Sequence, residues 1–409
     1  MGAHKSGSPT TQRFHYAFLL AWPFESLGGV NGVLQNLLRE FHEDGELTPI
    51  AIEVSGADGA APAPQGHPWP TVSFGPISSW NPQRPWRSLM AFCVKAPGVL
   101  WRLRVVCGQY SIRVLNPHFI GLEYLPLLLL RKLRLFHGKL ILSFHGSDIR
   151  EMMQSRGLER VLNKMLLRGA DKLVPCSEGL REELLMFVPD CAARTVVIHN
   201  GIDAPAFLSL ATRPFLLPER LRERKIILNI GAYEYKKGHD VLLRAFALLK
   251  PDHPEAALAI AGQRDSATVA QLGAELGIQD DLLLLESIPH AQIVSLLKRA
   301  DLFVLSSRWE KGVCGEGFAM AILEAAAARK PVVSTNSCGI SELMRDGDTG
   351  RIVPTENPEA LAEAMADLLT DSDAAARMAG RLHERVVQEF TWTSAYRKYL
   401  QLAGPTREL

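Results

Sequence analysis

The 409-residue sequence lacks the patterns typical of a zinc protein, a membrane-spanning protein or a nucleic-acid-binding protein. Its six cysteines include no C-x-x-C pair and no zinc-ligand spacing, which favours a reduced, cytoplasmic environment. No apolar run reaches the ~18 residues that a membrane span needs, and the polar start lacks the apolar stretch of a signal peptide. Lys and Arg total 45 against 44 Asp and Glu, so overall charge gives no support for nucleic-acid binding.

Length and periodicity predict two α/β domains. A single core stops growing at ~250–300 residues, and this chain exceeds that size. Strand-like and helix-like segments alternate in both halves, as in doubly wound sheets. In the first unit, a strand-like run over 14–22 leads through Gly28, Gly29, Val30, Asn31 and Gly32 into a helical pattern. This turn is not G-x-G-x-x-G, so a dinucleotide-dependent oxidoreductase loses its main support.

The same periodicity predicts further elements in each half. In the first half it predicts strands at 47–54, 112–115, 139–144, 172–175 and 195–198, and helices at 86–105, 122–136 and 179–187. In the second half it predicts strands at 226–231, 257–261, 282–285 and 302–305, and helices at 239–249 and 292–299. The last 50 residues read as helical.

The stretch 308–335 holds the most informative residues. Glu316 lies among three glycines, which allow a ligand to approach the backbone: Gly312, Gly315 and Gly317. A helix is predicted from near Phe318, and its first-turn amides suit a phosphate. If the helix included Glu316, Glu324 would lie ~12 Å further along its axis, on the same side. The two carboxylates could then hold two hydroxyl-bearing parts of one ligand, although ordinary solvated glutamates in an Ala-rich helix remain the alternative.

These residues resemble a known family. The Glu-x7-Glu spacing, LEAAAARKPVV and the GxxELxxDGxTGxxV run over 339–353 are similar to the retaining nucleotide-sugar glycosyltransferases of family 4. The resemblance implies the GT-B fold, an α/β fold of two facing doubly wound Rossmann-like domains with a C-terminal crossover helix. It places a disordered tail at 1–12, an acceptor-side domain at 13–204, a linker at 205–224, a nucleotide-sugar-binding domain at 225–388 and the returning helix at 389–409.

The resemblance also assigns site residues. The implied catalytic residues are Glu316, His145 of SFHGSD and Lys237 of GAYEYKKG. The implied donor-binding residues are Gly28, Gly29, Lys236, Lys237, Ile288, Gly317, Phe318, Ala319 and Glu324, and Asn31 lies on the acceptor side. The local basic charge, not the resemblance, adds Arg131, Lys132 and Arg134 to the acceptor side. Ala232 departs from the family pattern, which has an Arg at this position. We predict no metal and no other cofactor, because Asp346-Gly347-Asp348 reads as a turn.

The implied reaction is transfer of a hexose or a related sugar from a nucleoside-diphosphate sugar, expected to be a UDP-sugar, with retention of configuration. We expect the acceptor to be a saccharide or a polyprenyl-diphosphate-linked saccharide, as in surface polysaccharide or glycolipid biosynthesis. An epimerase or phosphorylase with the same fold and a non-catalytic nucleotide-sugar-binding protein are the alternatives. Both could carry the same fold.

Charge clusters in one segment of the first half. Residues 84–139 hold ten Lys or Arg against one acid, Glu123. Within it, 127–136 interleaves apolar and basic residues, as an interfacial helix does. We therefore expect an anionic membrane surface as a partner, on the inner face of the plasma membrane, and no nucleic acid. A core helix with a solvated basic face is the alternative.

Overall fold

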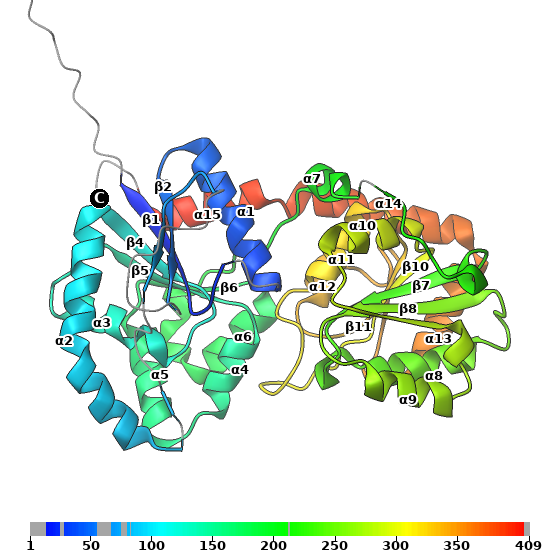
Figure 1. The fold of residues 1–409 in the computed structure, drawn as a ribbon, viewed down its shortest axis with the longest axis horizontal. Helices are drawn as coiled ribbons and strands as arrows, with labels where there is room; N and C mark the ends of the chain where they lie inside the picture. The colour runs from blue at the N-terminus through cyan, green and yellow to red at the C-terminus, as the bar shows by residue number, and fades with distance from the viewer. Residues whose placement is uncertain are drawn as a thin grey trace, which may run out of the picture. The chain divides into compact units, whose positions relative to one another are not determined.

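The computed structural model describes residues 14–24, 28–54, 67–74, 80–81, 83–211 and 213–404 (Figure 1). The predicted disordered tail at 1–12 lies outside the described residues. Contacts divide the chain into two compact units. Unit 1 consists of Met1–Ser143, Gly157–Leu173 and Tyr399–Leu409, and unit 2 of Phe144–Arg156 and Val174–Lys398.

The first sheet has six strands in the order β3-β2-β1-β4-β5-β6. Their bounds are β1 His15–Leu20, β2 Thr48–Glu53, β3 Thr71–Ser73, β4 Ile112–Pro117, β5 Lys139–Phe144 and β6 Lys172–Pro175. β1 lies in the middle and pairs in parallel with β2 and β4. Its residues Tyr16 to Leu20 are fully buried, as expected for a parallel strand covered on both faces.

The helices α1 Gly29–Asp44, α2 Pro85–Gln109, α3 Leu125–Lys132 and α5 Gly157–Gly169 belong to unit 1. α1 packs on β2, α2 on β4 and α3, and α3 on α5. The last helix, α15 Trp392–Ala403, begins in unit 2 and ends in unit 1. In unit 1, Tyr399 Oη lies 3.0 Å from Ser143 Oγ, and Lys139 Nζ donates to the carbonyl of Leu402 at 3.0 Å.

The second sheet has six strands in the order β12-β11-β10-β7-β8-β9. Their bounds are β7 Lys225–Ile230, β8 Ala256–Gly262, β9 Leu282–Glu286, β10 Leu302–Leu305, β11 Val332–Thr335 and β12 Arg351–Val353. β7 pairs in parallel with β8 on one side and with β10 on the other. The chain order therefore reverses between β7 and β10, and loops at the carboxyl ends of such strands are where open α/β sheets bind ligands.

Helices cover both faces of the second sheet (Figure 1). α8 His239–Leu249, α9 Ala267–Glu275 and α13 Pro358–Thr370 lie on one face, and α10 His290–Arg299, α11 Met320–Ala327 and α14 Ser372–Glu389 lie on the other. The remaining helices of unit 2 are α4 Ser147–Gln154, α6 Glu178–Phe187, α7 Ala204–Ser209 and α12 Ile340–Leu343. Five short 3-10 turns complete the described elements: η1 Leu122–Tyr124, η2 Pro189–Arg194, η3 Glu219–Leu221, η4 Tyr235–Lys237 and η5 Gln279–Asp281.

The two parallel six-stranded sheets confirm the predicted α/β class with two doubly wound regions. Two predicted elements were wrong in detail, and a third, a helix, starts two residues after its approximate predicted start. Residues 195–198 form no strand, although the amide of Ile198 donates to the carbonyl of Pro175 at 3.2 Å. The predicted helix at 122–136 is η1 followed by α3, which ends at Lys132. The helix expected from Phe318 begins at Met320.

Within the described ranges, the structure contains no helix with the length and apolar character that a bilayer crossing requires.

Candidate functional site

The candidate site of unit 2 is formed at the carboxyl ends of three adjacent strands, β7, β10 and β11. Lys237 ends the η4 turn that follows β7, Ser306 and Ser307 follow β10, and Ser337 follows β11. These loops lie at the point where the strand order reverses. The position is therefore the one at which a doubly wound sheet is expected to bind its ligand.

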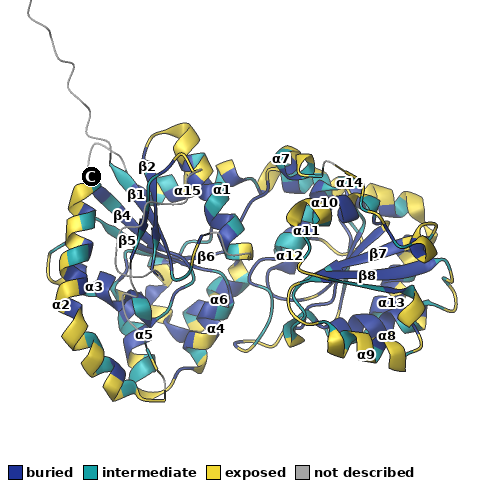
Figure 2. Ribbon diagram, viewed as in Figure 1, coloured by how far each residue is buried: buried dark blue, intermediate teal, exposed yellow. Residues whose placement is uncertain are grey.

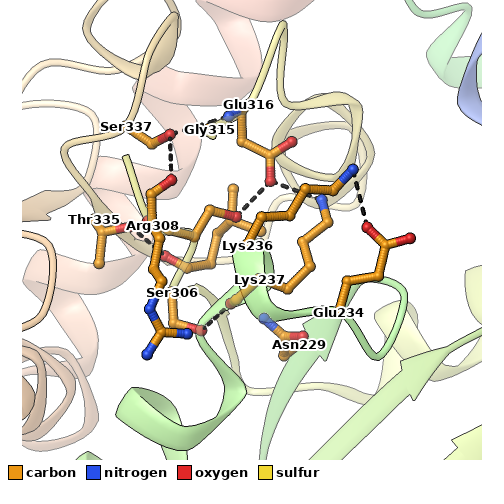
Figure 3. Close-up of polar contacts among 12 residues, drawn as sticks. Asn229, Glu234, Lys236, Lys237, Ser306, Arg308, Gly315, Glu316, Thr335 and Ser337 are labelled. Atoms are coloured by element: carbon orange, nitrogen blue, oxygen red, sulfur yellow. Dashed lines mark hydrogen bonds and ion pairs between the residues drawn. The ribbon is translucent and has the colours of Figure 1, made fainter. Parts of the chain in front are cut away.

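A lysine and a carboxylate meet at this point (Figure 3). Lys237 Nζ donates to Glu316 Oε1 at 2.7 Å, and the hydroxyl of Ser307 donates to the same oxygen. Both partners are largely buried, with side-chain exposures of 17% for Lys237 and 13% for Glu316. The structure thus brings together two of the three residues predicted to be catalytic.

The carboxyl of Glu316 is held in its charged form. Burial by itself raises its pKa. The charge and hydrogen bond of Lys237, the hydrogen bond of Ser307 and the charge of Lys236 together lower the pKa by more than burial raises it. The net effect holds the pKa of Glu316 below its usual value of 4.5. At neutral pH this group can only accept hydrogen bonds, which suits ligand hydroxyl groups.

Two glycines fix the position of Lys237. Gly238 has a φ of +61°, and a Cβ there would lie 2.2 Å from the carbonyl oxygen of Ser306. Gly231 follows β7, and a Cβ there would lie 3.2 Å from Lys237 Cδ. The lysine stem therefore runs over a backbone without a side chain, while Gly238 holds the η4 turn against the end of β10.

Arg308 ties the same turn to the β10 loop from the other side. Its Nη1 donates to the carbonyl of Tyr235 at 2.7 Å, and its guanidinium lies 4.1 Å from the centre of the Tyr235 ring. Its Nη2 donates to Asp240 Oδ2 at 2.7 Å. The backbone amide of Arg308 also donates to the carbonyl of Lys236 at 2.8 Å. These contacts fix the turn that carries both lysines.

His145 approaches the Glu316 loop through its backbone. A Cβ on Gly317 would lie 1.8 Å from the carbonyl oxygen of His145. Only glycine allows this approach, so the segment after β5 and the loop before α11 lie in direct contact within unit 2. Burial lowers the pKa of the His145 imidazole to about 4, which leaves the ring neutral at pH 7. The carboxylate of Asp148 accepts from the amides of His145 and Gly146 at 3.2 and 2.8 Å.

The sequence interpretation missed Arg150 and Glu183. Arg150 Nε donates to Glu183 Oε2 at 2.9 Å, and the two side chains are 4% and 2% exposed. Arg150 Nη1 also donates to the carbonyl of Gly315 at 2.7 Å, and Nη2 to that of Glu316 at 3.3 Å. A buried ion pair therefore fixes the backbone on both sides of the Glu316 side chain. No sequence pattern joins these positions, since Arg150 and Glu316 are 166 residues apart.

Lys236 and Ala232 lie beside a second charged group. Lys236 Nζ is 3.0 Å from Glu234 Oε2, and Arg264 Nη2 is 2.9 Å from the other oxygen of the same carboxylate. Figure 3 shows Lys236 directed toward Glu234 while Lys237 is directed toward Glu316. The sequence interpretation missed Arg264, which brings a further cation close to the loop that carries Ala232.

The second glutamate has a different setting from the one expected. Glu316 precedes α11, so the predicted helical geometry between Glu316 and Glu324 is wrong; the backbone of the glycine-rich loop is held by Arg150 and does not continue the helix. Glu324 Oε1 lies 3.4 Å from His290 Nε2. The hydrogen bond that His290 donates to Glu324 raises the pKa of His290, against the opposing effect of burial. This contact joins α11 to the first residue of α10, two residues after Ile288.

Phe318 and Ala319 lie between Glu316 and α11, and both are buried. The Phe318 ring stacks on the His199 ring, with centroids 5.4 Å apart. His199 Nε2 lies 2.7 Å from Glu342 Oε2. The Phe318 side chain thus packs into the interior of unit 2. Because both side chains are buried, Phe318 and Ala319 could bind a donor only through their backbone, and this role stays a prediction.

The predicted residues of unit 1 form separate groups. Gly28 and Gly29 lie at the start of α1, where a Cβ on Gly29 would meet no atom of the described residues within 4 Å. The Asn31 side chain is buried and accepts from Trp22 Nε1 at 2.8 Å. Its amide donates to the carbonyls of Pro23 and Phe24 at 3.0 and 2.9 Å. Asn31 thus fixes the loop after β1, and its acceptor-side role stays a prediction.

The basic residues Arg131, Lys132 and Arg134 lie at and just after the end of α3, and their acceptor-side and membrane roles stay predictions. Leu127, Leu128 and Leu130 are buried in unit 1, so the apolar face of α3 packs inward, as the core-helix alternative predicted. Arg131 donates to the carbonyl of Gly169 at 3.0 Å and to Asp171 Oδ1 at 2.8 Å. A pocket of about 290 Å³ is lined by Arg131, Lys132, Arg134, His137 and neighbouring apolar residues.

No group of three metal-ligating His, Cys, Asp or Glu side chains occurs in the part of the chain that the structure describes. The DGDTG segment is a turn between α12 and β12, as predicted. Asp346 accepts from the amide of Ile352 at 2.8 Å, and Asp348 pairs with Arg381 at 2.7 Å. The two carboxylates therefore have separate protein partners.

Comparison with known proteins covers both parts of the chain. The family model described as glycosyl transferases group 1 matches residues 218–384, and the one described as glycosyltransferase family 4 matches 27–204. Glycogen synthase of Mycobacterium tuberculosis is 31% identical over 241 residues, 56% of this chain and 52% of that protein. The GDP-mannose-dependent alpha-(1-6)-phosphatidylinositol monomannoside mannosyltransferase of Mycolicibacterium smegmatis is 25% identical over 388 residues, 93% of this chain and 96% of that protein.

Among solved structures, the sucrose-phosphate synthase of Thermosynechococcus elongatus superimposes with a TM-score of 0.74 at 19% identity, over 95% of this chain and 98% of that one. This match concerns the fold alone. The chain spans about half the length of the glycogen synthase that it matches and nearly all of the mannosyltransferase.

Proposed function

Because the chain belongs to the group 1, family 4 glycosyltransferases, we propose that it transfers a sugar from a nucleoside-diphosphate sugar to a saccharide or lipid-linked saccharide acceptor. The sheet topology and the match to a solved synthase confirm the GT-B fold. The proposal adds retention of configuration, UDP as the expected nucleotide and independence from metal. It also adds a place in surface polysaccharide or glycolipid biosynthesis.

The pairing of Lys237 with Glu316 carries the proposal. A largely buried ammonium and an ionised carboxylate lie side by side at the switch point of the sheet, next to the glycine backbone of Gly231 and Gly317. A nucleoside-diphosphate sugar presents an anionic diphosphate next to neutral hydroxyl groups. The ammonium suits the first and the carboxylate the second, so the pair matches both parts of one donor.

The chemistry follows from where charge builds up. The bond between the anomeric carbon and the diphosphate oxygen breaks, the acceptor hydroxyl oxygen bonds to that carbon, and the hydroxyl proton leaves with the diphosphate. Negative charge therefore grows on the diphosphate in the transition state. Lys237 would stabilise this charge in a site that is already organised before the reaction. Glu316 would orient the sugar hydroxyls, and neutral His145 with its carbonyl would contact the sugar from the other side.

Glu324, Ile288 and the glycines of unit 1 complete the proposed donor site. Glu324 would accept from the ribose hydroxyls, and Ile288 would lie beside the base. Gly28 and Gly29 would allow the diphosphate to approach the backbone of the β1–α1 loop. The His290–Glu324 contact supports the first two assignments, because it holds the residues assigned to the base and to the ribose close together.

The first experiment is a thermal-shift screen of the purified protein against UDP, GDP, ADP and their sugars. A donor stabilises the folded state by mass action, by about 2.7 kcal/mol at a hundredfold excess over its Kd. We expect UDP and a UDP-sugar to raise the Tm. GDP is the essential comparison, since one relative is named as GDP-mannose-dependent. No shift with any nucleotide would count against the whole donor site.

The second experiment follows transfer directly. A radiolabelled donor that passes the screen is incubated with saccharide and lipid-linked acceptors, with and without EDTA, and the anomeric configuration of the product is read by NMR. We expect an acceptor-dependent product that retains the configuration and forms equally in EDTA. Loss of activity in EDTA with recovery in Mg²⁺ would refute metal independence. Nucleotide binding without any transfer would favour a non-catalytic binding protein.

A further inference from the structure

Helix α2 of unit 1 exposes a line of large apolar side chains to solvent. Figure 2 shows exposed residues along the whole length of this helix. We call the following set the apolar row, given with exposed fractions: Trp86 66%, Met90 70%, Val94 82%, Trp101 66% and Val105 44%. Large apolar side chains at such exposure are informative when they form one continuous patch.

The spacing places the apolar row on one side of the helix. Its members are separated by four, four, seven and four residues, and at 100° per residue they fall within a sector of about 100°. The opposite side of α2 is buried in unit 1 and holds the helix in place through Ala96, Val99, Leu100, Leu103 and Cys107. Because α2 is already anchored by this inner face, the apolar row is not required to hold the helix to its own unit.

The charges around the apolar row have one sign. Residues 85–109 contain no Asp or Glu and four basic residues: Arg87, Lys95, Arg102 and Arg104. By the same helical geometry, Arg87 and Arg104 fall at opposite edges of the apolar row, and both are exposed. A helix with apolar side chains in the middle, tryptophans toward both ends and basic residues at the edges matches an anionic lipid surface.

We propose that the apolar row of α2 is a membrane-docking surface, on which the protein adsorbs to anionic bilayers with α2 parallel to the surface. The row would lie at the boundary between headgroups and acyl chains, and Arg87 and Arg104 would contact lipid phosphates. This moves the proposed membrane contact from α3, whose Leu127, Leu128 and Leu130 are buried, to α2, which packs on α3. Docking itself does not depend on the proposed function; only its purpose, the capture of a lipid-linked acceptor, rests on that function.

Charge argues against a second copy of the chain as the occupant. In a two-fold dimer the same surface meets itself, so Arg87 and Arg104 would face a partner surface with the same positive charges. An anionic bilayer instead complements both the apolar row and its edges. The exposed Lys132 and Arg134 of unit 1 make no ion pair with any residue that the structure describes, so they add positive charge to the same unit.

The test is flotation of the full-length protein with phosphatidylcholine vesicles that contain or lack phosphatidylglycerol, at low and high salt and without nucleotide. We expect binding to anionic vesicles at low salt and a fall of at least roughly tenfold for the double variant Trp86→Ala, Trp101→Ala. Arg87→Gln and Arg104→Gln should each reduce binding roughly fivefold. The matched control is Val161→Ala with Leu248→Ala, two exposed apolar residues outside the row, and it should bind like wild type.

A second readout separates insertion from other causes. Vesicles with brominated acyl chains should quench the fluorescence of wild type, and Trp86→Phe with Trp101→Phe should lose most of the quenching while keeping most of the binding. Thermal unfolding of each variant verifies that it is folded. Analytical ultracentrifugation detects a second copy, and a dimer that the double alanine variant abolishes would overturn the proposal if vesicle binding is absent.

Other results would also overturn it. The proposal fails if wild type binds no vesicle, binds neutral and anionic vesicles equally, or is matched by the double alanine variant. It also fails if vesicle binding is lost only in the variant Lys132→Glu with Arg134→Glu. Because no donor is present in flotation, failure of docking leaves the transfer assay untouched. Likewise, failure of transfer to water-soluble and lipid-linked acceptors would remove the proposed function but not row-dependent flotation.

Discussion

The two glycine-rich loops predicted to lie against the donor differ in what surrounds them. In unit 2, a side chain on Gly317 or Gly238 would collide with the carbonyl of His145 or Ser306, at 1.8 and 2.2 Å. In unit 1, a Cβ on Gly29 would meet no described atom within 4 Å, and one on Gly28 only Asn31 Oδ1 at 3.8 Å. Protein packing thus explains the unit 2 glycines, whereas no contact within the described residues requires glycine at the start of α1.

A glycine in a predicted ligand loop can therefore serve either of two roles: close packing of the protein backbone or access for a ligand. Gly317 and Gly238 allow two backbone segments to meet, and this contact positions Glu316 and Lys237. Gly29 makes no such contact among the described residues, and its contact with the donor diphosphate stays a prediction. Substitutions can separate the two roles, because the first affects folding and the second affects only activity.

The largest effect on activity is expected from loss of the Lys237 ammonium in unit 2. Lys237→Ala should lower kcat by ~10²–10³, since one preorganised electrostatic donor is lost. Lys236→Ala is the comparison variant and should cost less, because its ammonium pairs with Glu234 and not with Glu316. Steady-state kinetics with the donor identified by the screen provide the measurement. Equal losses in the two variants would remove the distinction between the lysines, and full activity in Lys237→Ala would refute the site assignment.

Gly317→Ala should destabilise the protein by about 1–3 kcal/mol, because the added methyl group must displace the His145 carbonyl or the Glu316 loop. Chemical denaturation of the full-length protein measures the loss in the free energy of unfolding. Gly380→Ala, within α14, serves as the control, since a Cβ there meets nothing within 4 Å. A wild-type unfolding curve for Gly317→Ala would mean that the close approach to His145 does not persist in solution.

Gly29→Ala should leave the fold intact and still lower kcat/KM, roughly tenfold, because the methyl group keeps the diphosphate from the backbone of the α1 start. The free energy of unfolding should be unchanged or slightly raised, since Ala is the better helix former. Kinetics and denaturation are measured on the same preparation. If activity is retained as well, the first loop does not contact the donor, and the contrast between the two loops loses its functional meaning.

Ala232→Arg should tighten nucleoside-diphosphate binding severalfold, because a guanidinium can make the bidentate phosphate contact that alanine cannot. Isothermal titration calorimetry measures the affinity. The gain should be larger in an Arg264→Ala background if Arg264, which shares Glu234 with Lys236, already supplies part of this charge. Unchanged affinity in both backgrounds would show that the second cation comes from another position.

The smallest effect concerns pH. The His145 pKa is lowered from 6.5 to about 4, so between these values the unfolded chain binds more protons than the folded one, and stability should fall as the pH drops from 6.5 to 4. Glu316 adds a further loss of stability only below pH 4.5, as the pH falls from its ordinary pKa toward its depressed one. Thermal melts across this range should show a shallower pH dependence for His145→Asn than for wild type.

Periodicity predicted most of the fold because parallel strands and amphipathic helices leave clear local patterns. The predicted bounds 139–144, 239–249 and 302–305 agree with β5, α8 and β10. The run at 195–198 is equally apolar in pattern, yet it forms no strand. Strand formation needs a hydrogen-bonded neighbour along the segment, and local sequence does not report whether the sheet supplies one.

The site was predictable where one segment carried it and hidden where distant segments met. Glu316 and Lys237 stood out through their glycine-rich surroundings and the family resemblance, and the structure pairs them. Arg150 and Glu183 lie in ordinary helical sequence, so only the fold reveals that they hold the loop of Glu316. The apolar row of α2 was hidden for the opposite reason, since an amphipathic pattern does not say which apolar side chains remain exposed.

The route of α15 has a consequence for synthesis of the protein. Unit 1 includes Tyr399 and Leu402, which bond to Ser143 and Lys139, so this unit stays incomplete until the ribosome has finished almost all of unit 2. At ~5–20 residues per second, the interval between residues 143 and 402 lasts roughly 13–50 seconds. During that time the nascent strand β5 lacks a partner that its final state requires, and a chaperone would have most to protect there.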